Sequence, residues 1–418
     1  MIKIIFMLFF LIINNSYSQW IAQSSGTGSF LVDVEFLNRN TGWAVGDGGV
    51  IIKTTNAGIN WLSIPNPTMG KPLFSIHIVD SNICYVVGWF ETIIKTTNGG
   101  NNWIEIRNGG FGFGSSYEAV FFIDENTGWI AGTGQKILRT TNGGDSIITQ
   151  PLFAGNLHDM YFKDALTGIV TGSGTDMFKT TNGGLNWINI EMPIGTRIPT
   201  FYKISFVGNQ FGWVAGSDNR IFRTTNFGDT WDSISAVPVS SLTSSMRFIE
   251  FSSERTGFAG GEQGYLYKST NEGIEWVREN SGIFPPAMMQ SMYMYNDSLG
   301  WIVGGGGKII KTTNGGQTIV NISGTTNIVP KKFSLSQNYP NPFNPSTSIN
   351  YSLAQPGFVQ LKIYDIRGKD IKSFINDFMN AGNYTLDIDD AGLNSGIYIY
   401  SLLYDQVIID SKRMVYLK

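Results

Sequence analysis

The chain has 418 residues, of which 15% are charged, and its formal net charge is −3. This length exceeds one ordinary domain and suits two. The weak negative charge excludes the basic field that binding to nucleic acid or acidic lipid would require. Glycine and aromatic residues are abundant, with 50 Gly, 11 Trp, 17 Tyr and 28 Phe. This mixture favours short β-strands joined by tight turns, because aromatic rings fit a pleated surface and glycine adopts positive φ.

The N-terminal segment has the pattern of a secretory signal peptide. Lys3 precedes the apolar run 4–13, and the small residues Ser16 and Ser18 stand just before the predicted cleavage site. The run is too short to cross a bilayer of about 30 Å as a helix. We therefore predict that residues 1–18 direct export and are removed, leaving no transmembrane segment in the mature chain. The alternative is a buried N-terminal strand.

Cysteine and histidine are too scarce for two common kinds of site. Cys84 is the only cysteine, which excludes an intramolecular disulfide. His77 and His158 are the only histidines, too few for a Cys/His zinc site. We predict that Cys84 is a small buried residue, and we expect neither a metal nor a cofactor.

Two motifs recur in register along residues 19–328. The segment Lys53 to Trp61 recurs at steps of 42, 44, 40, 44, 45 and 43 residues, and its copies begin at Lys53, Lys95, Arg139, Lys179, Arg223, Lys268 and Lys311. A Thr-Gly-Trp-x-x-Gly motif precedes it, first at residues 41–46 and in diverged form at residues 83–88. Apolar pairs two residues apart, such as Val34 and Phe36, lie further upstream. Each unit predicts four short strands, and seven units predict a seven-bladed β-propeller.

The ends of the repeat region predict how the ring closes. Residues 20–26 resemble residues 276–282, which begin at the tryptophan that ends the sixth copy of the first motif. We predict that the N-terminal strand completes the seventh blade, and that the segment after Ile319 is displaced toward a linker.

The pattern Thr54-x-Asn56-x-Gly58-x-x-Trp61 resembles the Asp-box, or bacterial neuraminidase repeat, with Asn in place of Asp in every copy. Together with the Gly-Trp motif, residues 20–323 resemble the propellers of photosystem II stability and assembly factors. The resemblance implies the seven-bladed fold. Members in photosynthetic organisms are assembly chaperones, but nothing in this chain indicates photosynthesis, so the fold transfers more safely than the function.

The box motif has a structural explanation. Asn tolerates left-handed backbone, Gly takes positive φ, and Trp fills the space between strands. The basic residue that begins each box has two interpretations: a charged ring, or side chains that lie over neighbouring strands.

Residues 329–418 differ in composition from the repeats. A Pro-Asn turn cluster is followed by predicted strands at residues 359–364, 384–388 and 396–404. The motifs Tyr339-Pro340-Asn341-Pro342-Phe343, Tyr364-Asp365-x-x-Gly368 and the terminal Lys-x-Met-Val-x-Leu-Lys resemble the type A C-terminal sorting domain of the type IX secretion system. The resemblance implies a small immunoglobulin-like β-sandwich that engages the secretion machinery and delivers the protein to the cell surface or the extracellular space. The alternative is a generic immunoglobulin-like module.

A propeller with Asp-box repeats can be an enzyme or a binding protein. Sialidases carry Asp-boxes, but they form six-bladed rings with three arginines around the substrate carboxylate, and the Arg197-Ile198-Pro199 signature follows four boxes here instead of preceding the first. The inner-strand carboxylates Glu35, Glu118, Asp159 and Glu250 are candidates for glycosidase chemistry, which needs a matched pair. A sequence does not reveal whether two of these side chains converge, and we predict no enzyme and no catalytic residue.

A ligand is expected on the top face, formed by the loops that lead into the inner strands and out of the Gly-Trp strands. The positions at which the repeats differ most are not constrained by the fold that all repeats share. The candidate ligand-binding residues are Trp89, Phe90, Glu118, His158, Arg197, Tyr202, Arg220, Arg247, Glu262 and Gln290. Aromatic side chains with a few charges suit a peptide or glycan; the alternative is solvated loops and local packing. The leading hypothesis is a non-catalytic scaffold for a protein or peptide partner, followed by a glycan-binding or adhesion propeller and then a glycoside hydrolase.

Overall fold

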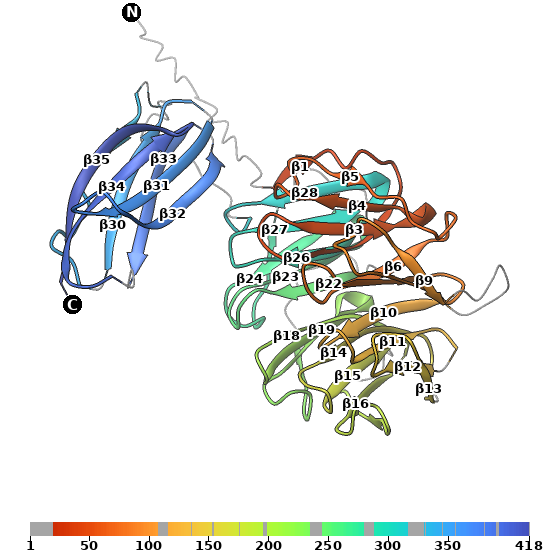
Figure 1. Ribbon diagram of the computed structural model, residues 1–418. Coiled ribbons are helices and arrows are strands. Elements are labelled where there is room, and N and C mark those ends of the chain that lie inside the picture. The colour runs from red at the N-terminus through yellow and green to blue at the C-terminus, as the bar shows by residue number, and fades with distance from the viewer. Residues whose placement is uncertain are drawn as a thin grey trace, which may run out of the picture. The chain divides into compact units, whose positions relative to one another are not determined.

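The computed structural model describes residues 20–107, 116–134, 136–152, 154–174, 176–194, 199–234, 245–279, 288–316, 330, 332–344, 346–355, 357–379, 381–389 and 393–417. The chain forms two compact units, Met1–Asn321 and Ile322–Lys418 (Figure 1). The predicted signal peptide, the segment after Ile319 and the predicted boundary after residue 328 lie outside the described residues.

The first unit consists of seven four-stranded antiparallel sheets, the blades. The first four are blade 1, with β2 (Leu31–Phe36), β3 (Gly42–Gly46), β4 (Ile51–Thr54) and β5 (Leu62–Ser63); blade 2, with β6 (Leu73–Ile78), β7 (Cys84–Gly88), β8 (Thr92–Thr96) and β9 (Ile104–Arg107); blade 3, with β10 (Tyr117–Phe122), β11 (Gly128–Gly132), β12 (Lys136–Thr140) and β13 (Ile148–Pro151); and blade 4, with β14 (Leu157–Phe162), β15 (Gly168–Gly172), β16 (Met177–Thr180) and β17 (Ile188–Asn189).

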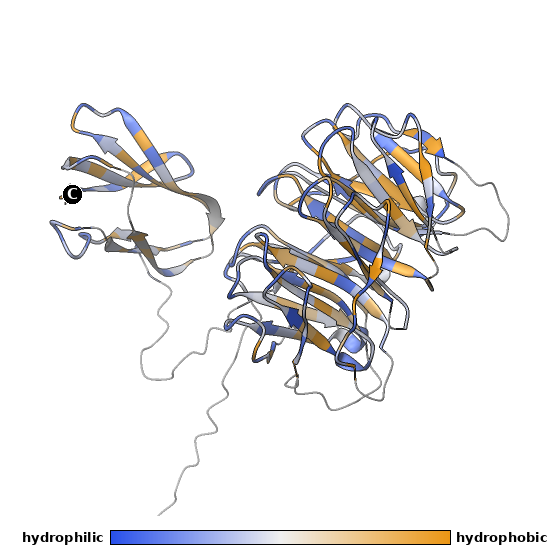
Figure 2. Ribbon diagram, turned by 90° about the horizontal axis from the view of Figure 1, so that it is seen from below, coloured by the Kyte–Doolittle hydropathy of each residue, from blue (hydrophilic) through white to orange (hydrophobic). Residues whose placement is uncertain are grey.

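The remaining blades repeat this order. They are blade 5, with β18 (Phe201–Val207), β19 (Phe211–Gly216), β20 (Ile221–Thr224) and β21 (Asp232–Ile234); blade 6, with β22 (Met246–Phe251), β23 (Gly257–Gly261), β24 (Leu266–Ser269) and β25 (Val277–Glu279); and blade 7, with β26 (Met289–Met294), β27 (Gly300–Gly304), β28 (Lys308–Thr312) and β1 (Trp20–Gln23). Single 3-10 turns follow the second strand of four blades: η1 (Asp47–Gly49), η2 (Ser217–Asn219), η3 (Glu262–Gly264) and η4 (Gly305–Gly307). Hydrophobic colour gathers on the strands and hydrophilic colour on the connecting loops (Figure 2).

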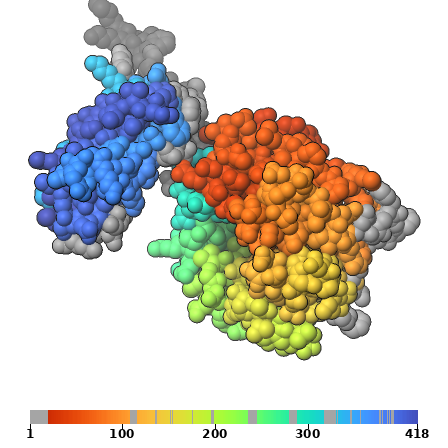
Figure 3. Space-filling model, in the orientation of Figure 1, coloured from red at the N-terminus to blue at the C-terminus, as the bar shows by residue number. Residues whose placement is uncertain are grey.

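The prediction that the N-terminal strand closes the ring is confirmed. β1 pairs antiparallel with β28, from Trp20 opposite Thr312 to Gln23 opposite Ile309. The first blade therefore lies beside the last (Figure 3). Trp301 of blade 7 adds a side-chain bond to this seam, because its Nε1 donates to the carbonyl of Ala57 in blade 1 at 3.2 Å.

An aromatic ring at the end of each of several inner strands joins neighbouring blades. Phe36 stacks on Trp301 of the preceding blade, with ring centroids 3.6 Å apart, and meets Trp61 of its own blade edge to face at 5.8 Å. Phe162 and Phe251 repeat this arrangement. One ring thus packs against both blades, and the box tryptophan belongs to the same core.

The glycine of the Gly-Trp motif is required by that ring. A Cβ added to Gly42 would lie 2.5 Å from the ring of Phe36, and one added to Gly128 would lie 2.4 Å from the ring of Phe122. Blade 2 departs from the motif in a matched way: Ile78 stands at the position of the ring, and Cys84, directly opposite, replaces the glycine. Cys84 is fully buried, and burial raises the pKa of its thiol to about 12. It is therefore a packing residue, as predicted.

The box forms a hydrogen-bonded turn that its basic residue links to the next blade. In the second copy, Thr96 Oγ1 accepts from Gly100 N at 2.9 Å and donates to Asn98 Oδ1 at 3.1 Å. The basic residue of the preceding copy, Lys53, donates from Nζ to the carbonyl of Gly99 at 2.6 Å. Lys95, Lys179 and Lys268 make the equivalent bond to the next box. These lysines lie over the neighbouring blade, so the charged-ring interpretation is not needed for them.

The second unit contains two sheets around one hydrophobic core. The first sheet consists of β29 (Ser334–Leu335), β30 (Ser346–Leu353) and β33 (Gly382–Asp389); the second consists of β31 (Gly357–Asp365), β32 (Asp370–Met379), β34 (Gly396–Tyr404) and β35 (Val407–Tyr416). Asn341 of the Pro-Asn cluster joins the end of β35, because its Oδ1 accepts from Val415 N at 2.8 Å. In the part of the chain that the structure describes, no helix is long and apolar enough to cross a membrane.

Candidate ligand-binding site

A cavity of about 420 Å³ opens where the inner strands begin, which is the top face of the propeller. Every blade contributes to its wall. The lining residues are Phe30, Val32, Asp33, Asp47, Phe74, Ser75, Glu118, His158, Tyr202, Lys203, Arg247, Gln290 and Ser291. We call this space the top cavity. Its mixture of aromatic, charged and amide side chains is typical of a site for a polar ligand.

A β-bulge in each inner strand builds this wall. The register of β2 against β3 shifts between Leu31 and Asp33, and the inner strands of the other blades shift at the equivalent place. A bulge inserts one unpaired residue and breaks the strict alternation of faces. In blades 1, 2, 5 and 7 the second and third residues of the inner strand, such as Val32 and Asp33, therefore both line the cavity.

Five of the candidate residues come together in the top cavity: Glu118, His158, Tyr202, Arg247 and Gln290. The imidazole of His158 is hydrogen-bonded on both sides, through Nδ1 to Glu118 Oε2 at 2.5 Å and through Nε2 to Ser173 Oγ at 3.0 Å. The guanidinium of Arg247 lies over the ring of Tyr202, 4.2 Å from its centroid. These contacts hold the four side chains in fixed orientations.

The other described candidates lie outside the lining of this cavity. Glu262 pairs with Arg247 at 2.9 Å and so orients it. Trp89 is 45% exposed and stacks on Phe90 in the turn between β7 and β8. Arg220 donates to the carbonyl of Ile194. Arg197 lies outside the described residues.

The lining residues that were not among the candidates are Phe30, Val32, Asp33, Asp47, Phe74, Ser75, Lys203 and Ser291. Asp33, Ser75, Lys203 and Ser291 lie just after the bulge of an inner strand, where a period of two assigns their side chains to the wrong face. Asp47 lies in η1, just after a Gly-Trp strand. The signal that could have identified it is the predicted position of that loop on the top face.

In the cavity wall and further along the inner strands, carboxylates accept hydrogen bonds from the backbone of the next blade. Asp33 Oδ2 accepts from Ile76 N at 3.0 Å, and Glu35 Oε2 accepts from Ile78 N at 3.0 Å. Asp159 Oδ2 accepts from Ile204 N at 2.9 Å. Three of the carboxylates considered for catalysis, Glu35, Asp159 and Glu250, thus belong to this blade-linking set, since Glu250 bonds the backbone of Met294.

The protonation of this region follows from burial and crowding. Burial raises the pKa of Glu250 to about 8, with a further contribution from the charges of Asp159 and Asp33. Burial and the charge of Asp33 likewise raise the pKa of Glu35 well above its usual value. Burial opposes the charged form of Lys203, but the carboxylates around it outweigh this effect and raise its pKa. Its ammonium lies 3.4 Å from Asp159 Oδ1.

His77 lies on the inner strand β6 and is neutral, and the described residues form no metal site. Burial lowers the pKa of His77 to about 4, so its ring is neutral at pH 7. Its Nε2 lies 2.8 Å from the carbonyl of Phe122 in the next blade, which identifies that nitrogen as the donor. Among the described residues, no three His, Cys, Asp or Glu side chains gather closely enough to hold a metal ion.

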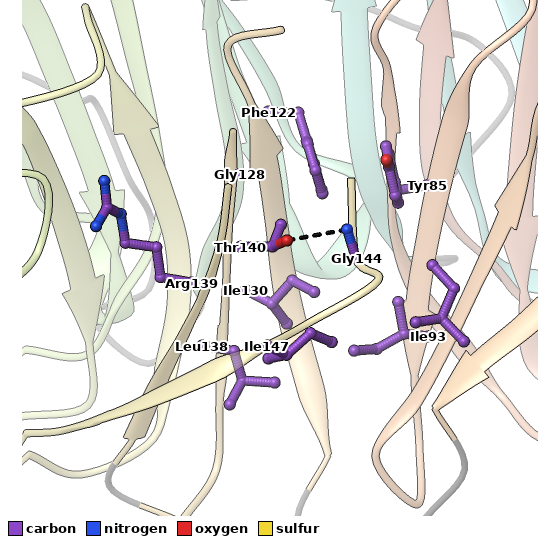
Figure 4. Close-up of a pocket in the computed structure, with 11 residues that line it drawn as sticks. Tyr85, Ile93, Phe122, Gly128, Ile130, Leu138, Arg139, Thr140, Gly144 and Ile147 are labelled. Atoms are coloured by element: carbon purple, nitrogen blue, oxygen red, sulfur yellow. Dashed lines mark hydrogen bonds between the residues drawn. The ribbon is translucent and has the colours of Figure 1, made fainter. Parts of the chain in front are cut away.

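A second, much smaller void of about 10 Å³ lies between blades 2 and 3 (Figure 4). Its lining is mainly apolar and includes Tyr85, Ile93 and Phe122. Tyr85 stands where most blades have the larger tryptophan, and its ring stacks on Phe122 at 3.7 Å. The void is thus a gap in the core between two blades and too small for a ligand.

Comparisons with known proteins support this architecture. Residues 12–110 and 146–240 match the family described as photosynthesis system II assembly factor YCF48, and residues 337–416 match secretion system C-terminal sorting domains. A search of curated proteins finds no match.

Solved propellers are similar in fold. YCF48 bound to D1 peptide has a TM-score of 0.59 at 18% identity, over 71% of this chain and 98% of that chain. YCF48 from Cyanidioschyzon merolae has a TM-score of 0.58 at 17% identity, over 70% of this chain and 98% of that chain. The WD40 propeller domain of Doa1 has a TM-score of 0.54 at 11% identity, over 71% of this chain and 96% of that chain. At these identities the structures support the fold alone.

The sorting domain directs the protein to the cell surface or the extracellular space. The chain is therefore an exported β-propeller similar to the photosystem II assembly factor YCF48, followed by a C-terminal sorting domain of the type IX secretion system.

Proposed function

We propose that the protein is a non-catalytic scaffold that binds a peptide segment of a partner protein in the top cavity, and that its sorting domain delivers it through the type IX secretion machinery. The observation that carries this proposal is the cavity itself, with Arg247 over Tyr202 on one side and Glu118 bonded to His158 on another. The similar propeller YCF48 has been solved bound to D1 peptide.

The wall offers the contacts that an extended peptide uses. Tyr202 presents an aromatic face, and Gln290 presents an amide that can both donate and accept. The Nε of Arg247 is buried and makes no hydrogen bond to any described residue. A peptide carbonyl is a suitable acceptor for such a donor.

An array of short peptides with acetylated and amidated ends tests the proposal. The purified protein is compared with the variant Tyr202→Ala/Arg247→Ala. A matched control is Tyr265→Ala/Arg278→Ala, because Arg278 lies over Tyr265 at 4.4 Å in blade 6 but neither residue lines the cavity. We expect binding by the wild type and the control, and weaker binding by at least about tenfold for the cavity variant.

Two results would contradict the proposal. Equal binding by all three proteins would exclude the top cavity as the site. Binding of no peptide, with binding of oligosaccharides on a parallel glycan array, would instead favour the adhesion hypothesis.

A second candidate function is hydrolysis, favoured by the hydrogen-bonded series Glu118, His158 and Ser173. It ranks lower because the backbone N–H groups of Gly172 and Ser173 already donate to Asp176 and Asn156, each at 2.8 Å, and an oxyanion needs free donors. A fluorophosphonate probe distinguishes the two: labelling of the wild type that is lost in Ser173→Ala would establish a reactive serine.

A further inference from the structure

The two cationic side chains in the wall of the top cavity are already neutralised. Lys203 pairs with Asp159 at 3.4 Å, and Arg247 pairs with Glu262 at 2.9 Å. Both carboxylates lie beside the cavity and outside its lining. The wall therefore has little unpaired positive charge to offer an anionic ligand.

Of the three carboxylates of the wall, Asp33 and Asp47 form no ion pair with a described residue, and Glu118 faces the imidazole of His158. Asp33 accepts hydrogen bonds from backbone N–H groups and from Ser291 Oγ at 2.7 Å, and Glu118 bonds His158. Asp47 is exposed, and none of the ion pairs formed by the described residues includes it. A surplus of negative charge results.

The surplus lies on one side of the ring, next to aromatic rings. Asp33 and Asp47 come from blade 1 together with Phe30, and blade 2 contributes Phe74. Lys203 and Arg247 come from blades 5 and 6, which lie three and two blades from blade 1 around the closed ring. A carboxylate beside aromatic faces suits an alkylammonium or guanidinium group, which gains both an ion pair and a cation–π contact.

We propose that the peptide bound in the top cavity inserts a lysine or arginine side chain on the blade 1 and blade 2 side, against the carboxylate of Asp47 and beside Phe30 and Phe74. This inference rests on the proposed function and specifies its ligand: the recognised segment is basic.

Peptides that differ in one charge test the inference. Each binding peptide from the array is resynthesised with acetyl-lysine for lysine or citrulline for arginine, which remove the charge and keep most of the shape. We expect affinity to fall about tenfold or more, and to fall with added salt for the charged peptide only. Asp47→Asn should cause a similar loss. Asp145→Asn, the same change at an exposed box position, should cause none.

The outcomes separate the inference from the proposed function. If neutral analogues bind as well as the basic peptides, or if Asp47→Asn leaves the affinity unchanged, the inference fails while peptide binding stands. If no peptide binds at all, both fail. A preference for peptides with glutamate would reverse the assignment and place the ligand against Arg247.

Discussion

The carboxylates on the inner strands act mainly as hydrogen-bond acceptors for the neighbouring blade. An inner strand pairs on one side with its own blade and leaves N–H groups on the other side without ladder partners. Asp33, Glu35 and Asp159 each satisfy such a group at about 3 Å. Ser205 Oγ does the same for Phe251 N. Buried acids in a propeller channel can therefore be structural, even where several of them converge.

This role predicts an unusual pH dependence for Glu250. Its pKa is about 8 in the folded protein against an ordinary 4.5, so the folded state holds the proton longer than the unfolded state. Stability from this group is therefore lost as pH rises from about 5 to about 8. Glu250→Gln keeps an acceptor for the backbone and removes the titration. We expect the free energy of unfolding of the variant to rise relative to that of the wild type across this interval, by on the order of a few kcal/mol, and its melting temperature to rise with it.

The measurement is thermal unfolding of both proteins at several pH values. Glu254→Gln, an exposed change in the same blade, serves as the control and should follow the wild type. A difference between Glu250→Gln and the wild type that stays constant with pH would contradict the assignment.

At the scale of the strand, one pairing accounts for the Gly-Trp motif and for its exception. The last residue of the inner strand lies directly opposite the glycine: Phe122 opposite Gly128 in blade 3, and Ile78 opposite Cys84 in blade 2. The ring of Phe122 leaves no room for a Cβ on Gly128, whereas Ile78 lies opposite the side chain of Cys84. The glycine of blade 3 is thus specified by its aromatic partner.

A double-mutant cycle checks this relation. Gly128→Cys alone should destabilise the protein by about 1–3 kcal/mol, because the new side chain overlaps the ring of Phe122. Adding Phe122→Ile recreates the pair found in blade 2, so the double variant should be more stable than the sum of the single changes allows. Chemical unfolding gives the coupling energy. Phe251→Ile, in distant blade 6, should combine additively with Gly128→Cys; equal coupling in both pairs would contradict the steric explanation.

The strands also show how much of the structure could be predicted from the sequence. The register of two motifs sufficed for the order of four strands per blade and for the closing strand β1. The bulges were not predictable, because the residue that breaks the alternation, such as Val32, has no signature of its own. For this reason Glu118 and Tyr202 were selected, whereas Asp33 and Lys203 were missed. In the second unit, β34 was predicted with its exact bounds, but β32 lacks regular alternation and was overlooked.

For the whole molecule, the ring depends on a strand from the opposite end of the chain. β1 supplies the outer edge of blade 7, and its Trp20 packs edge to face on Phe258 at 5.8 Å. Trp301 and Ser291 add bonds from blade 7 to blade 1. Closure is therefore a cooperative feature that involves both ends of the repeat region.

Removal of residues 20–23 should destabilise the propeller strongly. The deletion exposes the edge of β28 and removes Trp20, whose loss alone is expected to cost about 3–5 kcal/mol. A protein that begins at residue 19 is the control. Calorimetry should show a lower melting temperature for the truncated protein, and light scattering should show aggregation through the open edge. An unchanged transition would mean that β1 is dispensable for closure.

The closing strand also bears on how such a ring can gain or lose blades in evolution. Because each of blades 1 to 6 is formed by four consecutive strands and only blade 7 combines strands from both ends, a tandem duplication of one repeat of about 43 residues inserts a complete blade and leaves the first and last strands untouched. Recombination between any two repeats would have the same effect, since each unit already carries the lysine or arginine that begins its box. The number of blades can thus change in whole steps, while the closing pair of β1 and β28 stays the same.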